Sequence, residues 1–380
     1  MVPLLPYGPE MPGEGGRAAT TPRRLSCKAI PKNMPAFAVG ELEQYVIAVF
    51  EAAGSSALEA RIVGQHLIDA NLAGHDSHGV VRVPEYVGWM EQKLINIGAH
   101  IRIVKESDAF AVMDGDWGWG QVVGREAMEL AIAKASKAGS ATISVRQCNH
   151  IGRVGDYTLM AAQRGMAATL FVNTHGAGKL VAPWGGRERR LSANPISFAV
   201  PRSSADPVVV DISTCAIAGG KVKIAYNSKK PVPAGCIVDS EGRPSTNPAD
   251  FFGPPEGALL PFGGHKGFAL GFISDILAGA ISGAGCSRPG ENRIGNSFLA
   301  TVVDIAQFRD RAAFDQDVDQ LSDYVKSSKL ADGSTEILVP GEPEKKERER
   351  REKNGVPVDE ETWRQIRETA ARYRADTDLG

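Results

Sequence analysis

The histidines of this chain are its clearest candidates for chemistry, because five of the seven lie in polar, glycine-containing segments between apolar ones. These five are His75, His78, His150, His175 and His265. His78 is followed four and eight residues later by Arg82 and Tyr86, a spacing that predicts one helical face for the three side chains. Such a face could hold a carboxylate on the guanidinium while the imidazole exchanges a proton. The alternative is that His78 and Arg82 only bond carbonyl groups at a helix end.

A second candidate acid or base is His150, in the segment Asn149-His150-Ile151-Gly152-Arg153. This segment follows the strand predicted over 141–145, and loops at strand ends commonly carry catalytic groups. A lone histidine in such a loop is still more often structural. The segment therefore leaves both interpretations open.

Two further segments could bind phosphate or ribose groups. The run Gly-Gly-His-Lys-Gly at 263–267 precedes a long apolar helix, so its N–H groups and Lys266 could form an anion site, although the spacing is not that of a Walker A loop. Asp211, with Ser213 and Thr214, ends the strand predicted over 208–212 and could contact a ribose. The alternative is that Asp211 only caps the next helix.

A glycine-rich turn at 118–124 also lies between a predicted strand and a predicted helix, as at the start of a Rossmann unit. Its spacing is G-x-G-x-x-x-G, and Asp114 and Asp116 precede it where an anion would be repelled. Glycines in this turn could instead relieve packing against the helix. The segment is thus a weak candidate for a cofactor site.

The composition excludes several classes of protein. Forty-three Lys and Arg against 45 Asp and Glu give a formal net charge of −2, which predicts binding neither to nucleic acid nor to an anionic membrane. The most apolar stretch, 268–284, is interrupted by Asp275 and is expected to be a buried helix rather than a membrane span. The five cysteines contain no C-x-x-C pair, and no metal-binding motif is present. We expect a cytoplasmic protein without a bound metal.

The elements that must position these residues fall into zones. Residues 1–35 are expected to be a disordered tail rather than an organelle-targeting signal, 36–100 a helical region, 101–310 a mixed α/β region, 311–370 helices that pack back on the body, and 371–380 a tail. In the α/β region, the apolar pattern predicts strands over 110–113, 141–145, 168–172, 197–200, 208–212 and 298–303. Helices are predicted over 121–138, 156–164 and 267–282.

Seven segments in this order resemble the malate/L-lactate dehydrogenase family of NAD(P)-dependent oxidoreductases, whose fold does not use a Rossmann fingerprint. The resemblance covers about 36–370. It is carried by DSHGVVRVPEYV (76–87), NHIGRVGDY (149–157), APWGG (182–186), SANP (192–195), VVVDIST (208–214), GGHKGFALGFISDILAGAISGA (263–284) and LVPGEPE…NGVPVDEETW (338–363).

The resemblance implies a mixed, largely antiparallel sheet with flanking helices, a helical N-terminal region and a homodimer. It gives His78 and His150 as proton donor or acceptor and places Arg82 and Tyr86 at the substrate. It also implies contacts to NAD or NADP from Asn173, Thr174, Asp211, Ser213, Thr214, His265, Lys266, Gly341 and Glu342. The turn at 118–124 then becomes structural.

The implied reaction is hydride transfer between nicotinamide and a small 2-hydroxy or 2-oxo acid, with a histidine as general acid or base. One departure concerns Ala193, which stands where the family commonly has a threonine that can contact the substrate carboxylate; Arg187, where the family often has lysine, could compensate. His175 also stands at a position where family members vary. Two alternatives stay open: a reductase of cyclic imino acids, and a ligand-binding relative that has lost catalysis.

Overall fold

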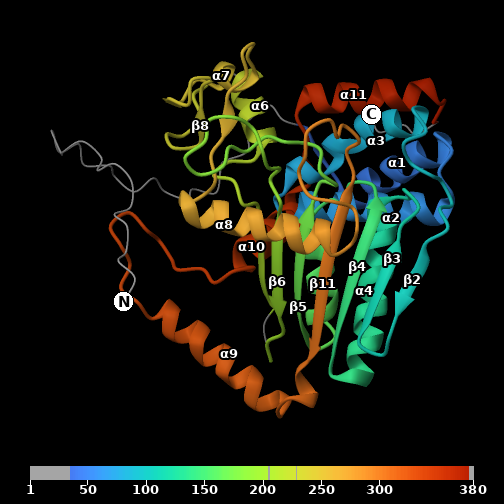
Figure 1. Cartoon of the computed structure of the whole chain (residues 1–380), viewed down its shortest axis with the longest axis vertical. Helices are drawn as coiled ribbons and strands as arrows, with labels where there is room; N and C mark the ends of the chain where they lie inside the picture. The colour runs from blue at the N-terminus through green and yellow to red at the C-terminus, as the bar shows by residue number, and fades with distance from the viewer. Residues whose placement is uncertain (1–34, 204–205, 228, 376–380) are drawn as a thin grey trace.

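A seven-stranded sheet forms the centre of the protein, in the order β2-β3-β4-β11-β5-β6-β7 (Figure 1). The computed structural model describes residues 35–203, 206–227 and 229–375. The strands are β2 (Arg102–Glu106), β3 (Phe110–Asp114), β4 (Ser140–Cys148), β5 (Met166–Asn173), β6 (Ile196–Val200), β7 (Val208–Ile212) and β11 (Asn296–Asp304). Only β3 and β4 run parallel, and every other neighbouring pair is antiparallel. The predicted mixed, largely antiparallel α/β fold is therefore confirmed.

One face of this sheet is covered by α4 (Gly120–Ala138) and α5 (Gly155–Ala162). Alternate strand residues point into the core beneath these helices, among them Ile143, Leu170 and Ala300, which are fully buried. On the opposite face the side chains are only partly covered, and Phe198 is 39% exposed. The six predicted strands and the first two predicted helices match elements of this sandwich.

A helical lobe packs beside the sheet. It contains α1 (Val39–Ala52), α2 (Ala57–Leu72), α3 (Val83–Glu91) and α11 (Glu360–Arg372), with the short pair β1 (Ala36–Phe37) and β12 (Val356–Pro357). The apolar face of α1 is buried, and α11 buries Trp363, Ile366 and Ala370 against the same core. α11 therefore packs on the helical lobe. The proposed tail over 1–35 lies almost wholly outside the described residues.

A small unit lies between β7 and β11 in the chain, and the sequence did not predict it. It consists of α6 (Gly219–Asn227), β8 (Ile237–Val238), β9 (Pro244–Ser245), α7 (Pro248–Phe252) and β10 (Ala258–Leu259). Its three strands have two residues each, too few to produce a recognisable alternation of apolar and polar residues. Its core instead gathers separated residues such as Val222, Ile237 and Phe251.

The remaining helices lie across and beside the sheet. α8 (His265–Asp275) continues into a π-helical segment, Ile276–Ala280, so the single helix predicted over 267–282 is locally widened. After a 3₁₀ turn at Ile305–Gln307, α9 (Arg311–Lys326) projects away from the rest of the protein (Figure 1). Among the described residues, none of the helices combines the length and the apolar character needed to span a bilayer.

The charged helix α10 (Glu342–Asn354) is only partly solvated, although its run EKKERERREK alternates both signs of charge. Arg351 is only 5% exposed, and its guanidinium contacts both carboxylate oxygens of Asp76 at 2.5 and 3.0 Å and Glu347 at 2.5 Å. Arg348 contacts Asp69 of α2 at 2.9 Å. α10 therefore holds the turn that carries Asp76 and His78 in place. The periodicity of charges within the helix could not predict this contact.

Candidate active site

The segment around His78 is not the single helix that its spacing predicted. Two 3₁₀ turns, Asp76–His78 and Val80–Arg82, precede α3, and the extended backbone of Gly79 (φ −91°, ψ −152°) separates them. His78 therefore does not share a helical face with Arg82 and Tyr86. The break turns the His78 side chain toward the loop after β4, where His150 lies.

The two predicted histidines lie side by side. Their rings are nearly parallel, at 12°, with centroids 5.4 Å apart. Tyr86 Oη lies 2.7 Å from His150 Nδ1, and Ser77 Oγ lies 3.1 Å from His78 Nδ1. Because Nδ1 of each ring already has a partner, Nε2 is the nitrogen left to exchange a proton with a ligand.

Burial and nearby positive charge keep both imidazoles neutral. Burial, followed by the positive charge of Arg82, lowers the pKa of His78 to about 3 and holds the pKa of His150 well below 6.5. The phenol of Tyr86 is 1% exposed, and its burial raises its pKa, so that it stays protonated. At neutral pH both rings are therefore uncharged, and a bound anion beside Arg82 would raise both histidine pKa values.

Arg82 stands at the start of α3 and is held in place by two bonds. Its Nε donates to the carbonyl oxygen of Ser77 at 2.7 Å, and Nη1 donates to Glu85 at 2.6 Å. Within the described part of the chain, its Nη2 makes no hydrogen bond. The guanidinium is thus oriented by the protein while one of its nitrogens can still bind a carboxylate.

The glycine turn at 118–124 has a packing role. A Cβ atom on Gly120 would lie 2.3 Å from the carbonyl oxygens of both Asn149 and His150, and one on Gly124 would lie 2.6 Å from the ring of Tyr157. The N-terminus of α4 therefore presses directly on the loop that carries His150. This geometry favours the structural interpretation of the turn.

Replacing Gly120 with alanine is expected to destabilise the protein by about 1–3 kcal/mol, because backbone atoms must move to admit the methyl group. The same shift displaces His150, so kcat is expected to fall more than KM rises. Thermal unfolding and steady-state kinetics measure the two effects. Gly40→Ala is the matched control, since nothing lies within 4 Å of its added Cβ. Wild-type stability and kcat in the Gly120 variant would contradict the packing role.

Several residues predicted to contact the cofactor already use their side-chain polar atoms in hydrogen bonds to other protein groups. Asn173 is fully buried and donates to Asp275 at 2.9 Å, while Thr214 donates to the Ala193 carbonyl at 2.8 Å. Thr174 donates to Ala177 at 2.5 Å, and Ser213 lies 2.6 Å from Cys215 Sγ. These side chains hold the ends of β5 and β7 in place, so any ligand contact from them would come from the remaining lone pairs or the backbone.

Other predicted contacts are more accessible. His265 and Lys266 are exposed in the first turn of α8. Gly341 caps α10, and Glu342, its first residue, accepts hydrogen bonds from Lys326 at 2.7 Å and from the Val339 amide at 3.1 Å.

Two residues predicted to bind a ligand, Asp211 and Arg187, are bonded to other groups of the protein. Asp211 Oδ2 accepts the Gly155 amide hydrogen at 2.8 Å, at the start of α5. Arg187 is paired with Glu241 at 2.9 Å, beside the β8–β9 turn. The structure therefore brings His78, Arg82, Tyr86 and His150 together, whereas Arg187 contacts a different part of the fold.

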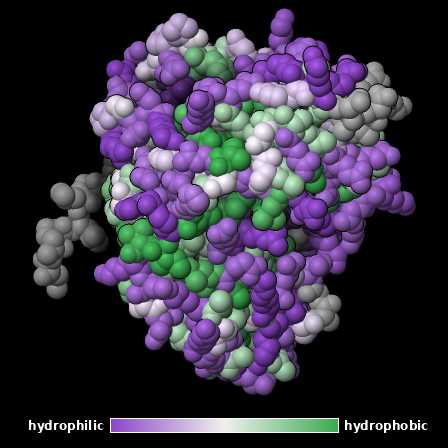
Figure 2. All heavy atoms as spheres, turned by 90° about the vertical axis from the view of Figure 1, so that its right-hand side faces the viewer, coloured by the Kyte–Doolittle hydropathy of each residue, from purple (hydrophilic) through white to green (hydrophobic). Residues whose placement is uncertain are grey.

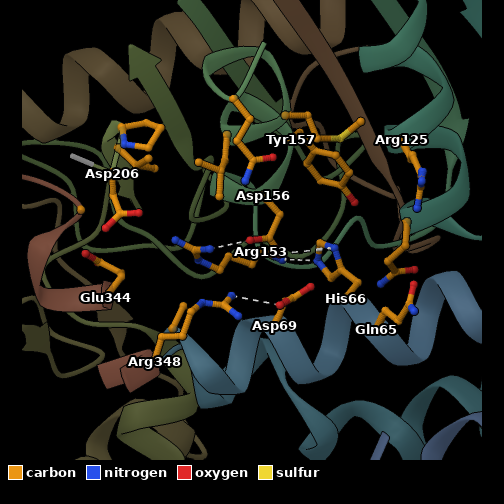
Figure 3. A pocket seen from close by; sticks show the side chains of 18 of the residues that line it. Gln65, His66, Asp69, Arg125, Arg153, Asp156, Tyr157, Asp206, Glu344 and Arg348 are labelled. Atoms are coloured by element: carbon orange, nitrogen blue, oxygen red, sulfur yellow. Dashed lines mark hydrogen bonds and ion pairs between the residues drawn. The ribbon is translucent and has the colours of Figure 1, made fainter. Parts of the chain in front are cut away.

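A charged cleft of about 680 Å³ lies between α2, α4, α5 and α10 (Figure 3). Among its lining residues, Arg153 Nη1 donates to Asp156 Oδ1 at 2.5 Å, and His66 Nε2 accepts the Arg153 amide hydrogen at 2.9 Å. Gln121 also lines the cleft, and it donates to Tyr86 Oη at 3.0 Å. The sequence did not predict a site role for His66, Arg153 or Gln121. Arg153 and Gln121 lie in segments that were singled out, but no spacing in the chain shows which residues these side chains contact.

The sequence model of one protein family, described as malate/L-lactate dehydrogenase, matches residues 37–367. The chain belongs to this family. Hydroxycarboxylate dehydrogenase B of Escherichia coli K12 is 38% identical over 334 residues, 87% of this chain and 92% of that protein. L-sulfolactate dehydrogenase of Methanocaldococcus jannaschii is 38% identical over 333 residues, 86% of this chain and 94% of that protein.

Solved structures in this family share the fold. Malate dehydrogenase from Pyrococcus horikoshii matches with a TM-score of 0.83 at 32% identity, over 91% of this chain and 97% of that one. Delta1-piperideine-2-carboxylate reductase from Pseudomonas syringae matches with a TM-score of 0.76 at 28% identity, over 88% and 100%. As a member of the malate/L-lactate dehydrogenase family, the protein is an oxidoreductase.

Proposed function

We propose that the protein transfers a hydride between NAD or NADP and a small 2-hydroxy or 2-oxo acid. The observation that carries the proposal is the pair of parallel, neutral imidazoles next to an oriented guanidinium. A hydroxy acid needs a cation for its carboxylate and a base for its hydroxyl hydrogen, and these groups supply both. The hydroxycarboxylate, sulfolactate and malate substrates named for the relatives have this chemistry in common.

In this mechanism Arg82 binds the substrate carboxylate, and His150 exchanges the proton. During oxidation, His150 Nε2 accepts the hydroxyl hydrogen as the carbonyl forms; during reduction, the imidazolium returns it to the developing alkoxide. His78 lies alongside and contacts the same oxygen. The nicotinamide, when bound, accepts or supplies the hydride at the substrate carbon. Tyr86 orients His150 through Nδ1 throughout.

The predicted cofactor residues fit a dinucleotide in part. The first turn of α8 carries partial positive charge from its backbone, and exposed Lys266 adds a full charge, which suits a pyrophosphate. His265 lies beside it, and Gly341 with Glu342 offers a second helix start for the ribose end. Asn173, Thr174, Asp211, Ser213 and Thr214 would frame the site between these ends, largely through backbone groups.

The test is spectrophotometric. Purified protein is mixed with NADH or NADPH and a panel of 2-oxo acids, and the loss of absorbance at 340 nm is followed. We expect turnover with at least one acid, and the rates with the two nucleotides give the cofactor preference. Absence of oxidation with every acid, together with absence of cofactor binding by calorimetry, would refute the proposal.

A second candidate, reduction of a cyclic imino acid, is favoured by the fold shared with the piperideine-2-carboxylate reductase. An imine carboxylate would use Arg82 in the same way, and the same panel tests it when cyclic imines are added. Loss of catalysis, which the departures at Ala193 and His175 suggest, would appear as ligand-dependent stabilisation without turnover.

The four described cysteines are free thiols, which suits the expected reducing cytoplasm.

A homodimer is also proposed, because apolar side chains remain on surfaces of the fold that this chain leaves uncovered. On the face opposite α4, Phe171 and Phe198 are adjacent, with ring centroids 6.3 Å apart. α8 exposes Leu270, Phe272 and Ile273, and the projecting α9 exposes Leu321, Tyr324 and Val325. Figure 2, which views the side with β2, shows an oblique band of hydrophobic side chains on the surface. A second copy would cover such surfaces.

Replacing Phe272 with aspartate is expected to halve the mass measured by light scattering, from twice the 40.4 kDa of the chain to a single copy. The reason is that a charge would have to be buried in the apolar contact. Leu58→Asp is the control, since Leu58 is 68% exposed on α2 of the helical lobe and the variant should stay dimeric. A wild-type mass of one chain would exclude the dimer.

A further inference from the structure

Gln121, the second residue of α4, lies behind the phenol that holds His150. Its side chain is 1% exposed, and its Nε2 donates to Tyr86 Oη at 3.0 Å. Its other end is unusual, because the buried atom Oε1 has no hydrogen-bond partner among the described residues. Leaving a buried acceptor unpaired costs free energy, so such an atom requires an explanation.

Counting hydrogens defines the state of His150 in this arrangement. Tyr86 has one hydroxyl hydrogen, and with Gln121 donating to its oxygen, that hydrogen is directed to His150 Nδ1 at 2.7 Å. The neutral ring then carries its own hydrogen on Nε2. This tautomer cannot accept a proton at Nε2, the nitrogen that faces a ligand.

Proton transfer requires the opposite arrangement. Both the imidazolium and the base that it leaves behind carry a hydrogen on Nδ1, which would then donate to Tyr86 Oη. The hydroxyl hydrogen of Tyr86 must in turn find a different acceptor. Gln121 Oε1 becomes that acceptor if the amide turns by half a rotation, since the amide then presents oxygen where it presented nitrogen.

We propose that Gln121 is a positioning residue whose amide rotates as the Nδ1 of His150 gains or loses its hydrogen, so that Tyr86 is bonded in both states. No covalent bond to Gln121 changes; the amide only exchanges its donor for its acceptor. An amide is suited to this position because it carries a donor and an acceptor of equal reach, which methionine and glutamate do not. The proposal rests on His150 being the acid or base of the proposed function.

The titratable groups around His150 do not by themselves stabilise the state in which Nδ1 carries a hydrogen. Arg82 from the start of α3, His78 from the preceding turn and His66 from α2 all face the ring, and each lowers the pKa of its imidazole. Among the described residues, the hydrogen-bond partners of Tyr86 Oη are His150 and Gln121, so none of these three groups accepts its hydroxyl hydrogen. The acceptor on α4 therefore counters the surrounding positive charge whenever the ring is protonated.

Two substitutions test the proposal by moving the protonation of His150 in opposite directions. Gln121→Met removes the acceptor, so the Nε2–H tautomer is favoured, the apparent pKa of His150 falls, and kcat for reduction drops about tenfold while KM changes little. Gln121→Glu supplies a permanent acceptor, so the apparent pKa rises and the Nδ1–H form is populated. Because a carboxylate also raises this pKa by its charge alone, the shift in Gln121→Met and its dependence on Tyr86 distinguish a positioning role from a purely structural one.

The decisive measurement is nitrogen NMR of the full-length protein labelled with ¹⁵N-histidine, in which the two ring nitrogens report the tautomer directly. The His150 signals are assigned by their absence in His150→Ala. We expect the Nε2–H form in the wild type, a shift toward Nδ1–H in Gln121→Glu, and no effect of Gln121→Met when Tyr86 is already phenylalanine. Gln163→Met is the control, because Gln163 is an exposed glutamine that lines the same cleft.

The outcomes separate this proposal from the proposed function. If both Gln121 variants keep the wild-type tautomer and the wild-type pH profile, the positioning role is wrong, whatever the activity. If the tautomers shift as expected but no hydride transfer is detected with any acid, the proposed function fails while the coupling between Gln121 and His150 stands.

Discussion

Replacing His150 with alanine is expected to lower kcat by about two to four orders of magnitude in both directions, the usual contribution of a positioned general acid or base. Cofactor affinity is expected to stay close to that of the wild type, because the imidazole contacts Tyr86 and His78 rather than any residue predicted to hold the dinucleotide. Steady-state rates at 340 nm give kcat, and calorimetric titration with the nucleotide gives the affinity.

Two further histidine variants show whether this loss is chemical. His78→Ala removes the parallel neighbour, and the residual rates of the two variants rank the histidines as proton donors. His100→Ala is the control for the loss of an imidazole, since His100 is exposed and outside the site. This variant should keep both the thermal stability and the kcat of the wild type. Equal loss of turnover and cofactor affinity in His150→Ala would instead mark His150 as structural.

Most of the sheet and its two covering helices could be predicted from the sequence because strands such as β4 and β5 alternate over much of their length against a single buried face. The strand predicted over 141–145, for example, lies inside β4, where Ala141, Ile143 and Val145 are buried. The small unit of β8 to β10 and the edge strand β2 could not be predicted in this way. The first has strands of two residues, and every residue of β2 is exposed, so neither produces a periodic signal.

The site was only partly accessible to sequence reasoning for a different reason. The spacing of His78, Arg82 and Tyr86 found the right residues, although the helix it assumed is interrupted at Gly79. Gln121 was missed because its importance lies in a contact to Tyr86, 35 positions away in the chain, which in turn bonds to His150. A sequence also cannot show that the side-chain amide of Asn173 donates to Asp275, so the cofactor role of Asn173 stays a prediction.

Arg82 combines two effects that can be separated by substitution. Its guanidinium is proposed to bind the substrate carboxylate, and its charge is second only to burial in lowering the pKa of both His78 and His150. Arg82→Met is expected to raise KM about 10- to 100-fold, since charge-assisted hydrogen bonds to the carboxylate are lost. Arg82→Lys retains the charge but not the forked geometry, so it should raise KM with little change in the histidine pKa values.

The pH dependence distinguishes the electrostatic effect from the loss of binding. In hydroxy acid oxidation the histidine must be neutral to accept a proton, so kcat/KM falls as the pH drops through its pKa. In the wild type the pKa is lowered, and activity should persist well below pH 6.5. Without the neighbouring cation the imidazolium is penalised less, the pKa rises, and the acidic limb moves to higher pH in Arg82→Met but not in Arg82→Lys. An acidic limb at the same pH in all three proteins would show that Arg82 binds the substrate without setting the protonation of the histidines.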